Sequence, residues 1–174
     1  MSSAPRPSSG NTSTDVAEQA REWMVWVEAV RLTHYSRADT FRKRNNEIGL
    51  AAILFSTVIS AGLLTSIHSG AGFWWKVAAA IVALLAALAT GVRSYLKLDD
   101  LSEQHRKAGA KFGEVYRELE LFVLGQPAND ASSRAELKGI AGEVGTLEEA
   151  GPGYPASVFQ KRYTQVKQRS TQAP

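Results

Sequence analysis

Charged residues nearly disappear from one part of the chain. Of the 45 positions from Ile48 to Val92, only Lys76 is charged, although 21% of all residues are. A helix of about 20 apolar residues matches the roughly 30 Å hydrocarbon core of a bilayer. The pattern therefore predicts two membrane-spanning helices, residues 48–67 and 73–92, and argues against a purely soluble globular fold.

The residues around these spans predict a topology. Between the spans, His68–Gly72 allows only a tight turn between antiparallel helices. Trp74 and Trp75 open the second span as an interfacial aromatic belt, and Lys76 is close enough to that end to reach the interface. The positive-inside rule then predicts a multi-pass membrane protein with both termini cytoplasmic. The basic residues that carry this prediction are Arg37, Arg42, Lys43 and Arg44 before the first span, and Arg93, Lys97, Arg106 and Lys107 after the second.

Both spans continue into amphipathic cytosolic segments. In residues 15–47 the apolar positions advance by threes and fours, which predicts a helix that runs unbroken into the first span, with Asp15 and Glu18 as a capping box. In residues 93–124 they repeat in heptads, which predicts a coiled-coil seam against the incoming helix. The seam positions are Leu98, Leu101, His105, Ala108, Phe112, Val115, Leu119 and Phe122.

Two shorter helices are predicted after the return helix. Ser133 and Glu136 open residues 133–149, a third amphipathic helix expected to dock on the antiparallel pair. Its glycines, Gly139, Gly142 and Gly145, should allow a close approach there. Residues 157–168 form a short basic helix, and residues 1–14 and 169–174 are tails, the first expected to be disordered. Residues 15–168 thus make one all-α domain: a two-transmembrane helical hairpin extended by long cytosolic antiparallel helices.

The amino-acid composition and the motifs exclude several kinds of partner, site and activity. The net charge of +3 comes from basic residues interspersed with acidic ones, which does not favour a nucleic-acid partner. The absence of cysteine excludes disulfides, thiolate metal sites and cysteine nucleophiles. There is no nucleophile elbow and no phosphate-binding glycine loop after a strand. We therefore expect no enzyme activity, cofactor or metal site.

Two sets of small residues in the spans are candidates for function. Ala79, Ala83, Ala87 and Gly91 recur at every fourth position and form a face that a second helix can approach closely. That helix is either the first span or another copy of the chain in a homo-oligomer, and the two readings are evenly balanced. Hydroxyls at membrane depth can line a wet path, although they more often bond to their own helix. The candidate pore-lining residues are Ser56 and Ser60.

A pair of histidines is predicted to meet in the seam. His34 lies 14 residues before the first span and His105 lies 13 residues after the second, so in antiparallel helices they reach the same depth. Phe112 follows His105 two turns later in the same seam. A satisfied polar layer is the default interpretation, while a pH sensor and a metal site are the alternatives.

Several motifs carry a family resemblance over roughly Ala20–Val166. They are Arg31-x-x-His34, Arg42-x-x-Asn45-Asn46-x-Ile48-Gly49, His105-x-x-Ala108-x-x-x-Phe112-x-x-x-Tyr116-Arg117-Glu118 and Glu148-Glu149-Ala150-x-Pro152-x-x-Pro155. In this arrangement the chain resembles the SLATT family. These are two-transmembrane effector domains associated with SMODS nucleotide synthetases and SLOG nucleotide sensors in prokaryotic conflict systems.

The resemblance implies a function at the lipid bilayer. It implies an oligomeric effector of antiphage defence that forms a pore or disrupts the membrane and causes abortive infection. No synthetase or sensor domain is fused here, so such a protein is expected to act in trans. The alternative is a membrane anchor or scaffold that recruits a soluble partner through its cytosolic helices, without a pore.

Overall fold

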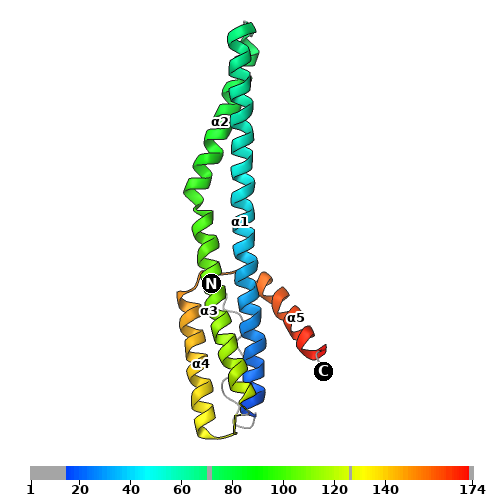
Figure 1. Cartoon of the computed structure of the whole chain (residues 1–174), viewed down its shortest axis with the longest axis vertical. Coiled ribbons are helices and arrows are strands. Elements are labelled where there is room, and N and C mark those ends of the chain that lie inside the picture. Colours follow the sequence, from blue (N-terminus) through cyan, green and yellow to red (C-terminus); the bar gives the residue numbers. More distant parts are fainter. Residues whose placement is uncertain (1–14, 70–71, 126, 173–174) are drawn as a thin grey trace. The chain divides into compact units, whose positions relative to one another are not determined.

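The computed structural model describes residues 15–69, 72–125 and 127–172, without the side chains at 59–69, 76, 89, 93 and 94. The described residues form helices and no strand, so the predicted all-α class is confirmed. The predicted tail 1–14 lies outside the described residues. The helices, shown in Figure 1, are α1 (Val16–Ser69), α2 (Phe73–Leu96), α3 (Leu98–Leu124), α4 (Ala131–Ala150) and α5 (Ala156–Gln172).

Helix α1 is one rod of 54 residues. No proline lies within it and its first glycine is Gly49, so nothing in its first 33 residues interrupts the backbone ladder. The Asp15 carboxylate caps its first turn by accepting a hydrogen bond from the Ala17 N–H, at 3.3 Å. This helix corresponds to the unbroken segment that the sequence predicts from residue 15 through the first span.

The chain divides into two compact units. The first, which we call the bundle unit, is Met1–Ala38 with Glu103–Pro174. The second, which we call the hairpin unit, is Asp39–Ser102. Helices α1 and α3 each contribute residues to both units.

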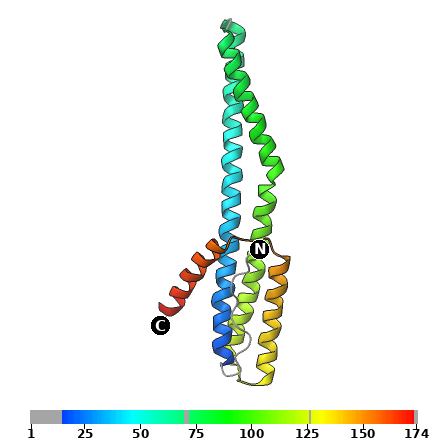
Figure 2. The same cartoon turned by 180° about the vertical axis from the view of Figure 1, so that it is seen from behind.

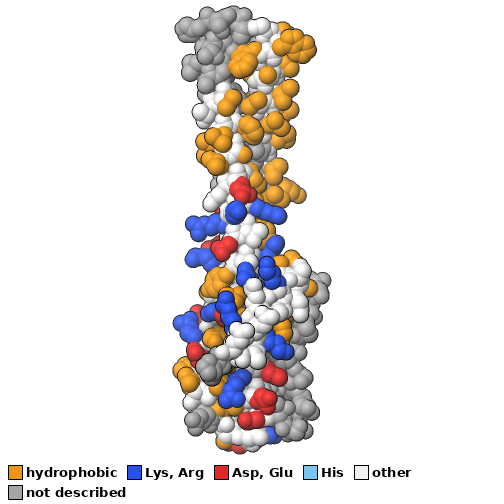
Figure 3. Space-filling view, turned by 90° about the vertical axis from the view of Figure 1, so that its right-hand side faces the viewer, with side chains coloured by type: hydrophobic (Ala, Val, Ile, Leu, Met, Phe, Trp, Pro, Cys, Tyr) orange, Lys and Arg blue, Asp and Glu red, His pale blue; other side chains and the backbone are white. Residues whose placement is uncertain are grey.

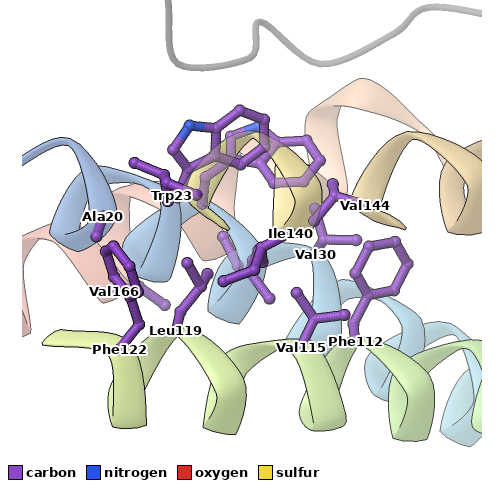
Figure 4. Packing of buried hydrophobic residues seen from close by; sticks show 14 of the residues in the cluster. Ala20, Trp23, Val30, Phe112, Val115, Leu119, Phe122, Ile140, Val144 and Val166 are labelled. Carbon is purple, nitrogen blue, oxygen red and sulfur yellow. The ribbon is translucent and has the colours of Figure 1, made fainter. Parts of the chain in front are cut away.

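The bundle unit is built on the predicted seam. Figure 4 shows side chains of α3 packed against those of α1 and α4. Val115 and Leu119 of α3 are at most 1% exposed, which fits the heptad spacing of the sequence. From α4 the apolar face contributes three buried residues to this core: Leu137, Ile140 and Val144.

Helix α1 is buried on a second face that its sequence pattern does not reveal. Trp26 and Ala29 are fully buried although they lie outside the predicted stripe of threes and fours. The Trp26 ring lies 6.1 Å from that of Phe159 in α5. Nearby, Thr33 is also buried, and its hydroxyl donates to the Ala29 carbonyl at 2.7 Å. Docking of α5 therefore covers a face that sequence spacing alone leaves for solvent.

The ends of α4 and α5 differ from expectation. The cap of α4 is Asp130 rather than Ser133, because the Asp130 carboxylate accepts the Ser133 N–H at 2.8 Å. The helix is therefore capped three residues earlier than predicted. Helix α5 reaches Gln172, so residues 169–172 of the expected C-terminal tail are helical.

In the hairpin unit, α2 runs back alongside residues 39–69 of α1, as both Figure 1 and Figure 2 show. The return leg is interrupted at Lys97, which adopts a left-handed conformation with φ 43° and ψ 45°. The sequence pattern predicted a second span at 73–92 that continues into a return helix at 93–124, and no break at Lys97. Beside the break, the buried Asn45 Nδ2 donates to the Asp99 carboxylate at 2.6 Å.

Two of the three glycines of α4 do not serve the close approach that we expected. Gly139 and Gly142 face open space, with no heavy atom within 4 Å of a Cβ built at either position. Close packing of α4 comes from the larger side chains at its buried positions instead. At these two sites glycine only weakens the helix, by about 1 kcal/mol relative to alanine.

We predict that Gly139→Ala raises the free energy of unfolding by about 1 kcal/mol, because alanine restricts the unfolded chain and clashes with nothing. The adjacent change Ile140→Ala is the matched control and should lower it by about 3 kcal/mol through loss of core packing. Denaturant unfolding of the full chain in detergent, followed by circular dichroism, measures both. A destabilising Gly139→Ala would show that this face of α4 is covered.

Candidate functional site

One helix among the described residues is long and apolar enough to cross a membrane, and it spans Phe73–Val92. These are the bounds of the second predicted span. Of the first predicted span, residues 48–67, the side chains at 59–67 lie outside the described residues. On the face in view, Figure 3 shows hydrophobic side chains gathered over the upper part of the hairpin unit, above the Lys, Arg, Asp and Glu side chains at its lower end. In water this surface would be unfavourable; in lipid it is compatible with its surroundings.

The small-residue face of α2 separates into two parts. Ala79 is half-buried and Ala86 is buried within the hairpin unit, so these residues belong to the packing inside one chain. Ala83, Ala87 and Gly91 are exposed, and a Cβ at Gly91 would meet nothing within 4 Å. An apolar groove of about 390 Å³ follows this part of the helix, lined by Leu84, Ala87, Leu88, Gly91, Val92 and Tyr95.

The other membrane candidates are placed only in part. Ser56 is exposed on α1, while the side chain of Ser60 lies outside the described residues. Next to Ser56, the Thr57 hydroxyl donates to the Ile53 carbonyl at 2.9 Å. Hydroxyls in apolar helices commonly bond to the carbonyl four residues earlier in this way. No charge is therefore needed to satisfy this hydroxyl in lipid.

The expected interfacial anchors lie at the start of α2. Trp74 is 81% exposed and Trp75 is 48% exposed, so both indole rings are available to a membrane interface. The side chain of Lys76, the third expected anchor, lies outside the described residues. Phe73 packs edge-on against Trp74, with ring centroids 5.7 Å apart, and adds a third aromatic ring to the same helix end.

The structure brings the two seam histidines together in the bundle unit. His34 Nδ1 and His105 Nδ1 are 2.9 Å apart, and both residues are 2% exposed. A hydrogen bond between two Nδ1 atoms requires one ring to carry its proton there and the other to carry it on Nε2. Phe112 stacks on His34 with centroids 5.6 Å apart, and Tyr154 meets the same ring edge-on at 5.1 Å.

This environment favours neutral histidines. Burial, followed by the charge of His105, lowers the pKa of His34 to about 4. The pKa of His105 is lowered as well, first by burial and then by the Arg37 guanidinium. A second Nδ1 proton would place two donors face to face. The pair is therefore a neutral polar layer at neutral pH, in which one ring donates its Nδ1 proton to Nδ1 of the other.

Sequence reasoning missed two contacts around this layer. Tyr154 follows α4 in an irregular segment, and no periodicity marks it as a core residue; its only sequence cue is its place between Pro152 and Pro155. In α3, Gly109 allows α1 to approach, because a Cβ there would lie 3.3 Å from the Tyr35 ring. Among the described residues, no group of three or more His, Asp or Glu side chains could hold a metal ion.

An exposed apolar helix of membrane-spanning length is typical of helical membrane proteins. Residues 17–129 match the family described as SMODS and SLOG-associating 2TM effector domain family 4. The chain belongs to this family, the SLATT family that its motifs resemble, and is thus a two-transmembrane effector of nucleotide-signalling conflict systems. The family is not known as catalytic. No curated protein and no solved structure matches the chain.

The family match has a structural consequence. It covers α1, α2 and α3 but stops at residue 129, before α4 begins. Contacts to the matched region are nevertheless made by later residues: Phe159 packs on Trp26, Tyr154 packs on His34, and Arg162 donates to the Ser36 hydroxyl at 3.1 Å. The segment after residue 129 therefore completes the core that the family domain begins.

We predict that acid destabilises the bundle through the histidine pair. The unfolded histidines have pKa values near 6.5 and the folded ones have lower values, so the folded state binds fewer protons below pH 6.5. Stability is retained above that pH and falls by about 3 kcal/mol from His34 as the pH drops toward 4. Thermal unfolding at a series of pH values measures this. In the double variant His34→Leu with His105→Leu, this part of the loss should vanish; parallel losses in both proteins would contradict the assignment.

Proposed function

We propose that this protein is an oligomeric effector of the inner membrane that breaches the bilayer when a nucleotide synthetase or nucleotide sensor acts on it in trans. The observation that carries the proposal is the exposed apolar surface of α2, and within it the uncovered face of Ala83, Ala87 and Gly91. The family to which the chain belongs supplies the context of nucleotide-signalling conflict systems.

The small-residue face supports a second copy as its occupant. Lipid covers an apolar helix adequately, so helices associate in a membrane through close packing rather than through the hydrophobic effect. Alanine and glycine at positions 83, 87 and 91 let the backbone of a neighbouring helix approach closely along the C-terminal half of α2. The intrachain contact uses Ala86 instead, which leaves this face for a contact between copies.

A pore needs several copies because one helical hairpin cannot enclose a water-filled path. In the proposed oligomer, α2 forms the contacts between copies and α1 lines the path with Ser56 and Ser60. Uncharged hydroxyls suit this role, since the free-energy cost of burying them in lipid before the oligomer opens is much lower than that of a charged group. The proposed orientation places both termini and the bundle unit in the cytoplasm, where the trigger is produced.

An anchor or scaffold is the second candidate, and the bundle unit supports it. Helix α5 carries Lys161, Arg162, Lys167 and Arg169 and no acidic residue, and it borders a cleft of about 550 Å³ against α1. A soluble partner could be held there without any pore. This candidate predicts that an unrelated transmembrane hairpin in place of residues 48–92 preserves function.

We predict that Ala83→Phe and Ala87→Phe each reduce triggered membrane depolarisation at least tenfold, because a ring on this face separates neighbouring helices. Ala78→Phe is the matched control: Ala78 is also exposed but lies five residues earlier, on another face of α2. A potential-sensitive dye in cells that express the effector with its trigger gives the readout, and crosslinking in membranes reports the oligomer.

Two outcomes would contradict the proposal. Unchanged depolarisation in the Ala83 and Ala87 variants would remove this face from the mechanism. Absence of depolarisation in the wild-type protein under an active trigger would favour the anchor instead.

A further inference from the structure

Lys97 has a backbone conformation that is unfavourable for a lysine. Lys97 is the one non-glycine residue with positive φ among the described residues, at 43°. A side chain with a Cβ is disfavoured in this left-handed region, which glycine usually occupies at helix ends. Lysine is instead a good helix former, and neither proline nor glycine occurs from Val92 to Ser102. The local sequence therefore prefers one continuous helix where the structure has a break.

Contacts within the hairpin unit hold this break in place. Asn45 of α1 is 3% exposed, and its Nδ2 donates to the Asp99 carboxylate two residues after the break, at 2.6 Å. A short hydrogen bond to an ionised acceptor belongs to the stronger class of such bonds. Leu98 is buried beside it, at 6% exposed, and the Leu101 N–H closes the first turn of α3 on the Lys97 carbonyl at 3.1 Å.

We propose that Lys97 is a hinge in the return leg and that the Asn45–Asp99 hydrogen bond is the latch that keeps it bent. Release of the latch lets Lys97 take ordinary helical dihedrals, so that α2 and α3 join as one helix. Strained backbone conformations persist only where surrounding contacts impose them, which makes such a position a natural two-state element.

The hinge would regulate contacts between copies made through Ala83, Ala87 and Gly91. This regulatory role rests on the proposed function, whereas the hinge itself does not. Gly91 lies six residues before Lys97 on the same helix, with Ala87 one turn further. Straightening at Lys97 changes the direction of this face relative to the first turn of α3. The latched form is the resting state, and the joined helix is the active one.

Distance measurements test the hinge without reference to activity. The chain has no cysteine, so Leu85→Cys and Asp100→Cys introduce the only two labelling sites, one on each side of the hinge. Fifteen residues of continuous helix separate the backbones by about 22 Å, and a bend shortens this separation. Pulsed electron paramagnetic resonance on the spin-labelled full chain, diluted with unlabelled chain in phosphatidylethanolamine and phosphatidylglycerol vesicles, gives the population of each form.

Two single variants should move the populations of the bent and straight forms in opposite directions. Asn45→Ala removes the latch and should raise the straight fraction at least fivefold, whereas Asn46→Ala, its exposed neighbour, should leave it unchanged. Lys97→Gly relieves the left-handed strain and should lower the straight fraction about tenfold, which corresponds to 1.4 kcal/mol. Combining Asn45→Ala with Lys97→Gly should return the population toward the wild-type value. Lys111→Gly, inside α3, controls for the effect of glycine on helix stability.

The outcomes separate the hinge from the pore. If the Asn45→Ala and Lys97→Gly chains show the wild-type distance distribution, the proposed hinge is wrong, regardless of how much dye leaks from the vesicles. If the distances shift as expected and dye leakage rises in Asn45→Ala and falls in Lys97→Gly, the hinge controls the breach. Shifted distances with no leakage from any chain would uphold the hinge and overturn the proposed function. Because Lys97→Gly should relieve strain, it tests the proposal even if Asn45→Ala fails to fold.

Discussion

The proposed function depends on contact between α2 and lipid. Twenty consecutive residues, Phe73–Val92, form a helix whose side chains are mostly uncovered by the chain itself. A helix satisfies its own backbone polar groups, so it can enter hydrocarbon without penalty, and its apolar side chains lose nothing there. Water would offer the same surface no compensation. The exposed apolar side chains of α2 therefore fit the hydrocarbon core of a bilayer better than they fit water.

The bundle unit obeys different physics, because its helices associate by burying apolar area from water. Its core includes a neutral histidine pair that makes its own hydrogen bond inside an aromatic surround. Buried polar groups are tolerated when they are satisfied, and such a layer can specify the pairing of two helices. The histidines thus join α1 to α3 at one end of the hydrophobic core, beyond Val30 of α1 and before Phe112 of α3. Later residues, including Tyr154 and Phe159, close the remaining sides.

Much of this arrangement follows from the sequence. The second span and the seam of α3 follow from the spacing within one helix, and the meeting of His34 with His105 follows from that spacing and the antiparallel pairing of two helices. Three features could not be predicted because they depend on how distant segments pack. Trp26 is covered by Phe159 of α5, the break at Lys97 lies beside the contact of Asn45 with Asp99, and Gly139 and Gly142 of α4 face open space. The candidate face on α2 was visible as a stripe, but only the structure separates Ala86 from the exposed Ala83 and Ala87.

Membrane topology tests the central claim most directly, and a chain without native cysteine is well suited to it. Single cysteines at Gly72, at the start of α2, and at Gln172, at the end of α5, can be labelled with a membrane-impermeant maleimide in intact cells. The account predicts that Gly72→Cys is labelled from outside, whereas Gln172→Cys reacts only after the cells are opened. Labelling of both positions from outside, or of neither, would contradict a chain that crosses the membrane twice with its bundle in the cytoplasm.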